Sequence, residues 1–465
     1  MAADMGYLNG PLATLPKPSL TFTVPSLHDG LPIDCRVYHP QSLAASPDAP
    51  PWQKHAAIIA HPYAPLGGCY DDPTVDIVAG ILLRLGFLVG TFNFRGAHGS
   101  AGRTSWTAKA ERADYMSVVG VVSHYVHFLD PFKPAIRSRP ESAGHDDGGV
   151  EADGAIRIRP PTPSLPELSG ATPILLLGGY SYGAMVTSQL PYLETIAAVF
   201  DKPECGTPAA EIRLRAQHLA EMQNTILASA REAAVDHLRP VSPRKHVGLR
   251  VGGDEESRKS HEYRRSLSAE FEETIRHGVA ELMAKTRKGH RRSHSGQGRT
   301  ARDPDGAPEQ NPEHLLPIPG QITFQPAYLL VSPLQGIVTN LATMSLPLLS
   351  TPGKVWARLS AKPDQQTAQA ESGSGSAVPE GTVSVEAEDK LVQNSTLAIY
   401  GNRDGFVPVR KLRDWASRLQ AVQGSKFRAH EVSSATHFWA QHNVVFTLQE
   451  AVRAFAASLL DEKTS

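Results

Sequence analysis

Residues 173–190 of the chain read PILLLGGYSYGAMVTSQL. The apolar run up to Tyr180 is typical of a buried strand, and the residues from Ser181 to Leu190 favour a helix. The pattern Gly179-Tyr180-Ser181-Tyr182-Gly183 joins the two. A serine on such a turn projects from a sharp bend, where side chains in place of the glycines would collide with the neighbouring strand and helix. The stretch therefore predicts a nucleophile elbow that carries Ser181. The alternative is a serine that only caps the helix.

A nucleophilic serine needs a base, and the base needs an orienting group. The strand-like residues 396–400 run into Asp404, and the strand-like residues 427–432 run into His437. Acid and base are 437 − 404 = 33 residues apart, which leaves room for one helix and one strand. Catalytic groups gather at the carboxyl ends of parallel strands. The sequence therefore predicts a triad of Ser181, His437 and Asp404.

Other interpretations of the acid and the base remain open. Asp404 alone is typical of a turn before a helix, and His437 alone is one loop histidine among 19. His430 and His442 are weaker candidates for the base, because the first lies within a strand and the second near a helix start.

Two backbone N–H groups are the expected oxyanion donors. The N–H of Tyr182 lies at the N-terminus of the helix after the elbow, where it can stabilise an oxyanion. The loop at residues 61–68, HPYAPLGG, supplies the second donor. That donor is the N–H of Tyr63, because Pro62 has none. The alternative for this loop is an ordinary turn between a strand and a helix.

The segments around the elbow alternate between strand and helix. Strands are expected at residues 19–24, 33–38, 56–60, 87–94, 173–180, 327–333, 396–400 and 427–432, and helices at 75–85, 113–129, 181–190, 409–419 and 443–460. Residues 327–333 are preferred to 196–200 as the strand that follows the elbow helix. Alternation of this kind predicts a parallel sheet with helices on its faces.

Three insertions interrupt a single domain at residues 19–460. They cover about residues 137–170, 203–322 and 352–391, and are rich in breakers or in charge. Such composition favours disorder or loose order. Residues 209–234, in the second insertion, have helical spacing and are expected to form a helix that contributes to a lid over the pocket.

The bulk composition argues against several classes of partner. The 46 basic residues nearly balance 47 acidic ones, which gives no reason to expect nucleic acid or a membrane surface as a partner. Residues 285–302 are basic, and a solvated linker is favoured over a nuclear targeting signal or a nucleic-acid site. No apolar run is long enough to span a membrane, and no signal peptide is recognisable. Three dispersed cysteines favour a reducing compartment, so the expected location is the cytoplasm. No metal or cofactor motif is present in the sequence, so no cofactor is expected.

Several motifs together resemble the α/β-hydrolase superfamily. They are His61-Pro62-Tyr63 with Gly67-Gly68, Asn93-Phe94-Arg95-Gly96 with Gly99-Ser100, Ala110-Glu111 with Asp114, and the elbow pattern. The resemblance is strongest to a group of small, poorly characterised hydrolases with H-P…G-G and N-F-R-G loops. It implies an α/β-hydrolase fold with a mostly parallel central sheet flanked by helices. It also implies a structural role for the loop at 95–100 and helix-start positions for Glu111 and Asp114.

The chain departs from that group in two places. His98 stands where a small residue is usual, and Thr436 precedes the histidine where aspartate is common. A solvated loop histidine is favoured for His98 over one that lines the pocket.

The function expected is that of a serine hydrolase. It would cleave a carboxylic ester or thioester of a small-molecule acyl substrate through an acyl-enzyme intermediate. The alternatives are a catalytically silent scaffold whose insertions bind a partner, and an acyltransferase or peptidase on the same core.

Overall fold

The computed structural model describes residues 14–46, 48–105, 107–132, 172–238, 277–278, 313–334 and 388–461. The expected insertions at 137–170 and 352–391 lie almost wholly outside these residues, as do the basic run at 285–302 and most of the second insertion beyond residue 238. None of the described helices has the length and apolar character needed to cross a lipid bilayer.

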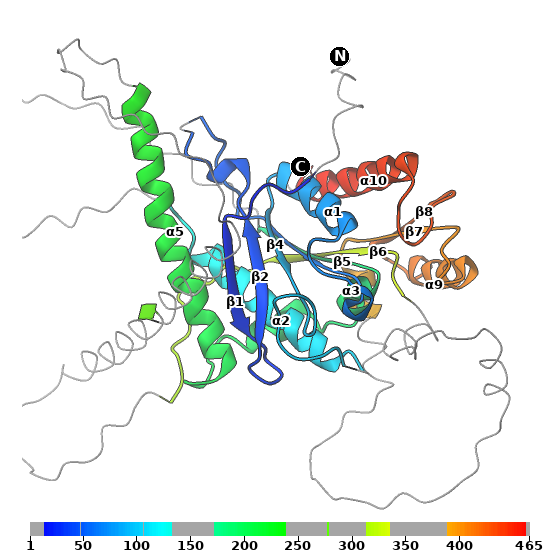
Figure 1. Ribbon diagram of the computed structural model, residues 1–465, viewed down its shortest axis with the longest axis horizontal. Coiled ribbons are helices and arrows are strands. Elements are labelled where there is room, and N and C mark those ends of the chain that lie inside the picture. Colours follow the sequence, from blue (N-terminus) through cyan, green and yellow to red (C-terminus); the bar gives the residue numbers. More distant parts are fainter. Residues whose placement is uncertain are drawn as a thin grey trace, which may run out of the picture.

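Eight strands form one sheet in the order β1-β2-β4-β3-β5-β6-β7-β8 (Figure 1). They are β1 (Leu20–Pro25), β2 (Pro32–Tyr38), β3 (Ala56–Ala60), β4 (Leu88–Phe92), β5 (Ile174–Tyr180), β6 (Gln325–Val331), β7 (Thr396–Gly401) and β8 (Phe427–Val432). Strand β2 pairs antiparallel with β1 and β4, and all other neighbours are parallel. Parallel pairing brings the carboxyl ends of β3 to β8 to one edge of the sheet.

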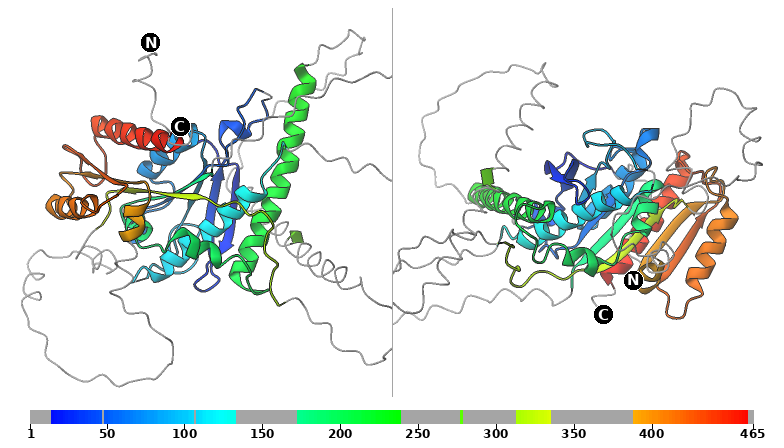
Figure 2. Two further views of the ribbon diagram at one scale, coloured as in Figure 1. Left: turned by 180° about the vertical axis from the view of Figure 1, so that it is seen from behind. Right: turned by 90° about the horizontal axis from the view of Figure 1, so that it is seen from below.

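Helices cover both faces of the sheet (Figure 2). They are α1 (Pro73–Arg84), α2 (Lys109–Phe128), α3 (Tyr182–Ser188), α4 (Leu193–Ala198), α5 (Pro208–Leu238), α9 (Val409–Gln420) and α10 (His442–Asp461). Successive side chains of a strand point to opposite faces. In β3, Ile58 packs in the core with α2, α3 and α5, whereas Ile59 packs in the core with α1 and α10. Both core layers bury the inner strands completely, which explains their unbroken apolar composition.

The predicted fold class is confirmed. The strand order, the parallel crossovers and the helices on both faces are those of the α/β-hydrolase fold. Strand β6 pairs with β5, as preferred from the sequence, while residues 196–198 belong to α4.

The helix expected at residues 209–234 is present as α5, but it does not lie over the elbow. Helix α5 packs along α2 and β1, at the opposite end of the sheet from β7 and β8 (Figure 1). Its apolar face, which includes Ile212, Ala216 and Leu219, is buried in the core with α2. The expectation that this helix forms part of a lid is therefore wrong, because its burial in the core fixes it elsewhere.

Candidate active site

Ser181 lies on the turn between β5 and α3. Its φ of 56° and ψ of −113° form a sharp bend that residues other than glycine rarely adopt. Its N–H donates a hydrogen bond to Val331 O at 2.8 Å. A Cβ added to Gly179 would lie 2.3 Å from Gly183 C, and one added to Gly183 would lie 2.5 Å from Ala60 O. Only glycine fits at both positions, so the predicted elbow is present for the predicted steric reason.

His437 links Ser181 to Asp404 by two hydrogen bonds. His437 Nε2 lies 2.7 Å from Ser181 Oγ, and His437 Nδ1 lies 2.7 Å from Asp404 Oδ2. The side chains of Asp404 and His437 are 0% and 5% exposed, so both hydrogen bonds are shielded from water. The structure thus brings together the three residues predicted as the triad. Of the two weaker candidates for the base, His430 lies on β8, away from this chain of hydrogen bonds, and His442 is the first residue of α10.

Backbone groups hold the carboxylate of Asp404 in place. Its Oδ1 accepts hydrogen bonds from the N–H groups of Phe406 at 2.8 Å and Val407 at 3.1 Å. One carboxylate oxygen is therefore fixed by the loop while the other faces the imidazole. This arrangement orients His437 so that the Nε2 atom points at the serine.

The two predicted oxyanion donors belong to segments that contact each other. Tyr182 is the first residue of α3, and its ring lies 5.2 Å from that of Tyr63, between centroids. Within the described ranges, no acceptor is recorded for the backbone N–H of either residue. Among the described residues, neither N–H is therefore committed to a backbone acceptor, as an oxyanion donor requires.

His61 connects the loop of Tyr63 to the next loop of the sheet. Its Nε2 accepts a hydrogen bond from the N–H of Phe94 at 2.8 Å, and its Nδ1 lies 2.5 Å from Pro62 O. Burial lowers the pKa of His61 to about 4, so the ring is neutral. A neutral ring that accepts at Nε2 carries its proton on Nδ1, and it donates that proton to Pro62 O. In the sequence, His61 stood out only as part of a motif, and no role was assigned to it.

The loop at residues 95–100 is structural, as the resemblance implied. The guanidinium of Arg95 forms two hydrogen bonds to the buried Asp114, Nη2 to Oδ1 at 2.6 Å and Nε to Oδ2 at 2.9 Å. Arg95 also pairs with Asp29, at 2.9 Å, and donates to Ser26 Oγ at 3.0 Å. Asp114 is therefore more than a helix-start residue. His98 is exposed in this loop, in agreement with a solvated histidine.

Lys390 is a buried lysine that no pattern in the sequence singled out. Its Nζ donates to the carbonyl groups of Thr187, at 3.2 Å, and Ser188, at 2.9 Å, and to that of Leu190. These carbonyl groups belong to the C-terminal end of α3 and the residues after it. No local pattern marks a single lysine after a long insertion as the partner of a helix about 200 residues earlier.

Strained backbone conformations occur at the edge of the sheet where the parallel strands end and Ser181 lies. Four residues other than glycine have left-handed φ here: Ser181 (56°), Ser332 (46°), Ser434 (66°) and Trp439 (53°). Trp439 Nε1 donates to Ser332 Oγ at 3.0 Å, and the N–H of Ser434 donates to Asn402 Oδ1 at 2.9 Å. Such conformations cost of order 1 kcal/mol or more each, and they persist where the surroundings over-determine them.

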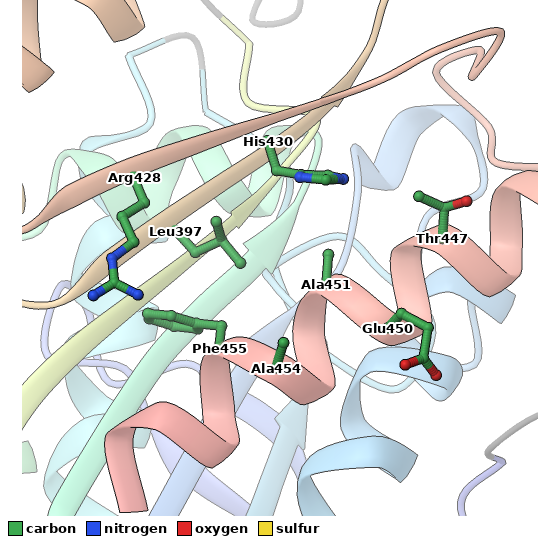
Figure 3. Close-up of a pocket in the computed structure, with 8 residues that line it drawn as sticks. All are labelled: Leu397, Arg428, His430, Thr447, Glu450, Ala451, Ala454 and Phe455. Carbon is green, nitrogen blue, oxygen red and sulfur yellow. The ribbon is translucent and has the colours of Figure 1, made fainter. Parts of the chain in front are cut away.

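A cavity of about 330 Å³ lies at a different place, between α10 and the edge of the sheet (Figure 3). Arg428 and His430 of β8 border it, with Leu397 and Phe455 on its apolar side. Leu397 and Arg428 pair near the amino ends of β7 and β8, whereas Asp404 and His437 follow the carboxyl ends. The cavity is therefore separate from Ser181. Among the described residues, no group of histidine, cysteine and acidic side chains could hold a metal ion.

No protein-family model matches the sequence, and no curated protein matches it either. Solved structures do resemble the chain. One is an α/β serine hydrolase homologue from Coxiella burnetii, with 11% identity, a TM-score of 0.38, and coverage of 95% of this chain and 99% of that one. An α/β serine hydrolase without lid from Xanthomonas campestris has 16% identity, a TM-score of 0.37, and coverage of 97% and 98%. Est1E from Butyrivibrio proteoclasticus has 11% identity, a TM-score of 0.38, and coverage of 95% and 100%. By its own strand order and its strand–turn–helix elbow, the chain has the α/β-hydrolase fold.

Proposed function

We propose that this chain is a serine hydrolase that cleaves a carboxylic ester or thioester through an acyl-enzyme intermediate. The observation that carries the proposal is the continuous chain of hydrogen bonds from Asp404 through His437 to Ser181, both links being 2.7 Å. A buried serine on a strained elbow has no structural need for such a partner. Further support comes from the N–H of Tyr182, which follows the serine in the chain, and from the N–H of Tyr63, whose ring contacts that of Tyr182.

In the proposed reaction, His437 removes the proton from Ser181 Oγ as this oxygen attacks the acyl carbon. Asp404 holds the imidazole in the required tautomer and stabilises its charged form. The N–H groups of Tyr182 and Tyr63 stabilise the oxyanion, each by about 3 kcal/mol. His437 then passes the proton to the leaving group. Water, activated by the same histidine, releases the acyl group and regenerates the serine.

A fluorophosphonate probe tests this proposal directly, because it labels only an activated serine. The wild-type chain should be labelled, and Ser181→Ala should not. Asp404→Asn should retain the fold but react about 10³ to 10⁴ times more slowly, because the imidazole takes the wrong tautomer. Circular dichroism spectra of the three proteins provide the control for folding.

Two results would contradict the proposal. A folded wild-type chain that takes no label would favour a binding scaffold on the same core. Equal labelling of Ser181→Ala would place the reactive group at another residue. The rate of ester hydrolysis, compared with the rate of acyl transfer to an added alcohol or amine, then distinguishes a hydrolase from an acyltransferase.

A further inference from the structure

Two exposed aromatic side chains border the imidazole of His437. Phe406 is 38% exposed and Phe438 is 64% exposed, although both are large and apolar. The ring of Phe406 lies 4.6 Å from that of His437, and the ring of Phe438 lies 5.7 Å from it, between centroids. The two phenylalanines also contact each other edge to face, at 5.6 Å. Single exposed apolar residues need no explanation, but a pair in contact with each other and with the proposed base does.

Neither side chain is needed to build the triad. The link from Phe406 to Asp404 is made by its backbone N–H, so it does not depend on the ring. The inner side of the imidazole is already covered by Tyr180, which is 3% exposed and whose hydroxyl donates to His437 O at 2.9 Å. Exposing two phenyl rings to water costs free energy that the fold does not recover, and a bound apolar group would recover it.

The chemistry of the reaction decides which part of a substrate lies against these rings. In acylation, Ser181 Oγ forms a bond to the acyl carbon, and the bond from that carbon to the leaving-group oxygen or sulfur breaks. The proton taken from Ser181 passes through His437 Nε2 to that leaving atom. The leaving group must therefore lie within hydrogen-bond reach of His437, whereas the carbonyl oxygen faces Tyr182 and Tyr63.

We propose that Phe406 and Phe438 form the binding surface for an apolar leaving group, so that the preferred substrates are esters or thioesters of hydrophobic alcohols or thiols. This inference rests on the proposed function, since it needs His437 to protonate the leaving group. It goes further by assigning specificity to the alcohol side of the substrate rather than to the acyl side.

Two matched ester series test the assignment. The first contains methyl, butyl and octyl acetate, which share one acyl-enzyme and differ only in the alcohol. The second contains the methyl esters of acetic, butyric and octanoic acid. In the wild-type chain, kcat/KM should rise with the length of the alcohol in the first series. The deacylation rate should be the same for all three acetates.

The variants Phe406→Ala and Phe438→Ala should each lower the ratio of kcat/KM for octyl acetate to that for methyl acetate by about 10-fold, because a few lost methylene contacts are worth that much. They should change the acyl-length series much less. Phe406→Leu and Phe438→Leu should restore most of the ratio, because they keep an apolar surface. Val422→Ala is the matched control. Val422 is 47% exposed and lies between α9 and β8, at the amino end of β8, and its loss should leave the ratio unchanged.

The inference is wrong if the double alanine variant keeps the wild-type ratio, either with its activity unchanged or with an equal loss of activity on methyl and octyl acetate. The second result would show that the rings only position His437. Labelling of the wild-type chain by a fluorophosphonate, whose leaving group is fluoride, reports on the proposed function separately. A labelled chain without preference for longer alcohols therefore overturns this inference alone, whereas an unlabelled chain overturns the function beneath it.

Discussion

Three histidine side chains are held neutral by the fold. Burial lowers the pKa of His39, His61 and His124 to about 4 each, whereas a histidine in an unfolded chain has a pKa of about 6.5. Between these values the unfolded chain binds more protons than the folded one. The free energy of unfolding is therefore fully retained above pH 6.5 and falls as the pH drops toward 4.

This difference in bound protons predicts that acid destabilises the chain, and part of the loss can be assigned to His124. His124, which is 1% exposed, should contribute up to about 2 kcal/mol of lost stability between pH 7.5 and pH 5. In His124→Phe, the fall in the free energy of unfolding over this range should be smaller by that amount, as measured by urea unfolding at both pH values. His98→Gln, at an exposed position, is the control. An unchanged pH dependence in His124→Phe would contradict the prediction.

At the scale of single residues, the sequence predicts those whose role follows from their position along the chain. Ser181, Asp404 and His437 were found because each directly follows a recognisable strand and because their order is that of a triad. The structure places these three side chains within hydrogen-bond reach of one another, as expected. Lys390 was missed because its role depends on contacts between distant segments, which leave no local pattern.

The short helix α3 illustrates how an element depends on a distant partner. It has only seven residues, and an isolated helix of that length is unstable in water. Its C-terminal carbonyl groups lack partners within the helix. In the part of the chain that the structure describes, Lys390 is the only recorded donor to the carbonyl groups of Ser188 and Leu190. The lysine therefore anchors the end of the helix opposite to Ser181.

Lys390→Met should destabilise the chain by about 3 kcal/mol, because it leaves buried carbonyl groups without donors while the side-chain volume stays similar. The midpoint of urea unfolding measures this loss. Lys411→Met, at an exposed position on α9, is the matched control and should change stability by less than about 0.5 kcal/mol. Equal stability of the two variants would show that Lys390 is not an anchor.

Most elements were predicted from periodicity, and the errors have local causes. Strands β3 and β8 occupy the predicted residues. Helix α2 begins at Lys109, four residues before the predicted start. Its first turn contains Glu111, which the resemblance placed at a helix start, and this side chain is 0% exposed and accepts hydrogen bonds from Ser105. A buried, satisfied carboxylate is invisible to a pattern that counts polar residues as exposed.

On the scale of the whole molecule, the ion pairs of Arg95 join three parts of the chain. They connect the turn between β1 and β2, through Asp29, and helix α2, through Asp114, to the loop that follows β4. The guanidinium is 5% exposed and Asp114 is 0% exposed. Removing one charge from such a pair leaves the other buried and uncompensated, which is costly.

Asp114→Asn should therefore destabilise the chain by about 3 kcal/mol. Glu431→Gln is a contrasting control, because Glu431 pairs with Arg413 at 2.6 Å on the surface, where such pairs contribute less than about 1 kcal/mol. Thermal unfolding of both variants beside the wild type gives the comparison. Similar losses in the two variants would contradict the distinction between the buried and the exposed pair.

The sequence predicted a parallel sheet but not the order of the strands within it. Alternating strands and helices indicate a parallel sheet, but they do not say which way the chain turns after each strand. Position in the sheet is decided by contacts between residues such as Tyr328 and Leu177, about 150 positions apart. The proposed single domain at 19–460 and its three insertions stay a prediction, because most inserted residues lie outside the described ranges.

At the edge of the sheet that carries Ser181, residues with left-handed φ bring selection for stability into conflict with selection for activity. Glycine at Ser434 would relieve the backbone and gain stability, but it would also free the loop after β8 that carries His437. At Ser332 this gain is opposed, because glycine removes the Oγ that accepts a hydrogen bond from the buried Trp439 Nε1. A laboratory evolution experiment that rewards only heat resistance should therefore enrich substitutions at Ser434 early. Variants from it would have a higher melting temperature and a lower turnover number. A screen for stable and active variants of this chain must therefore select for both properties at once.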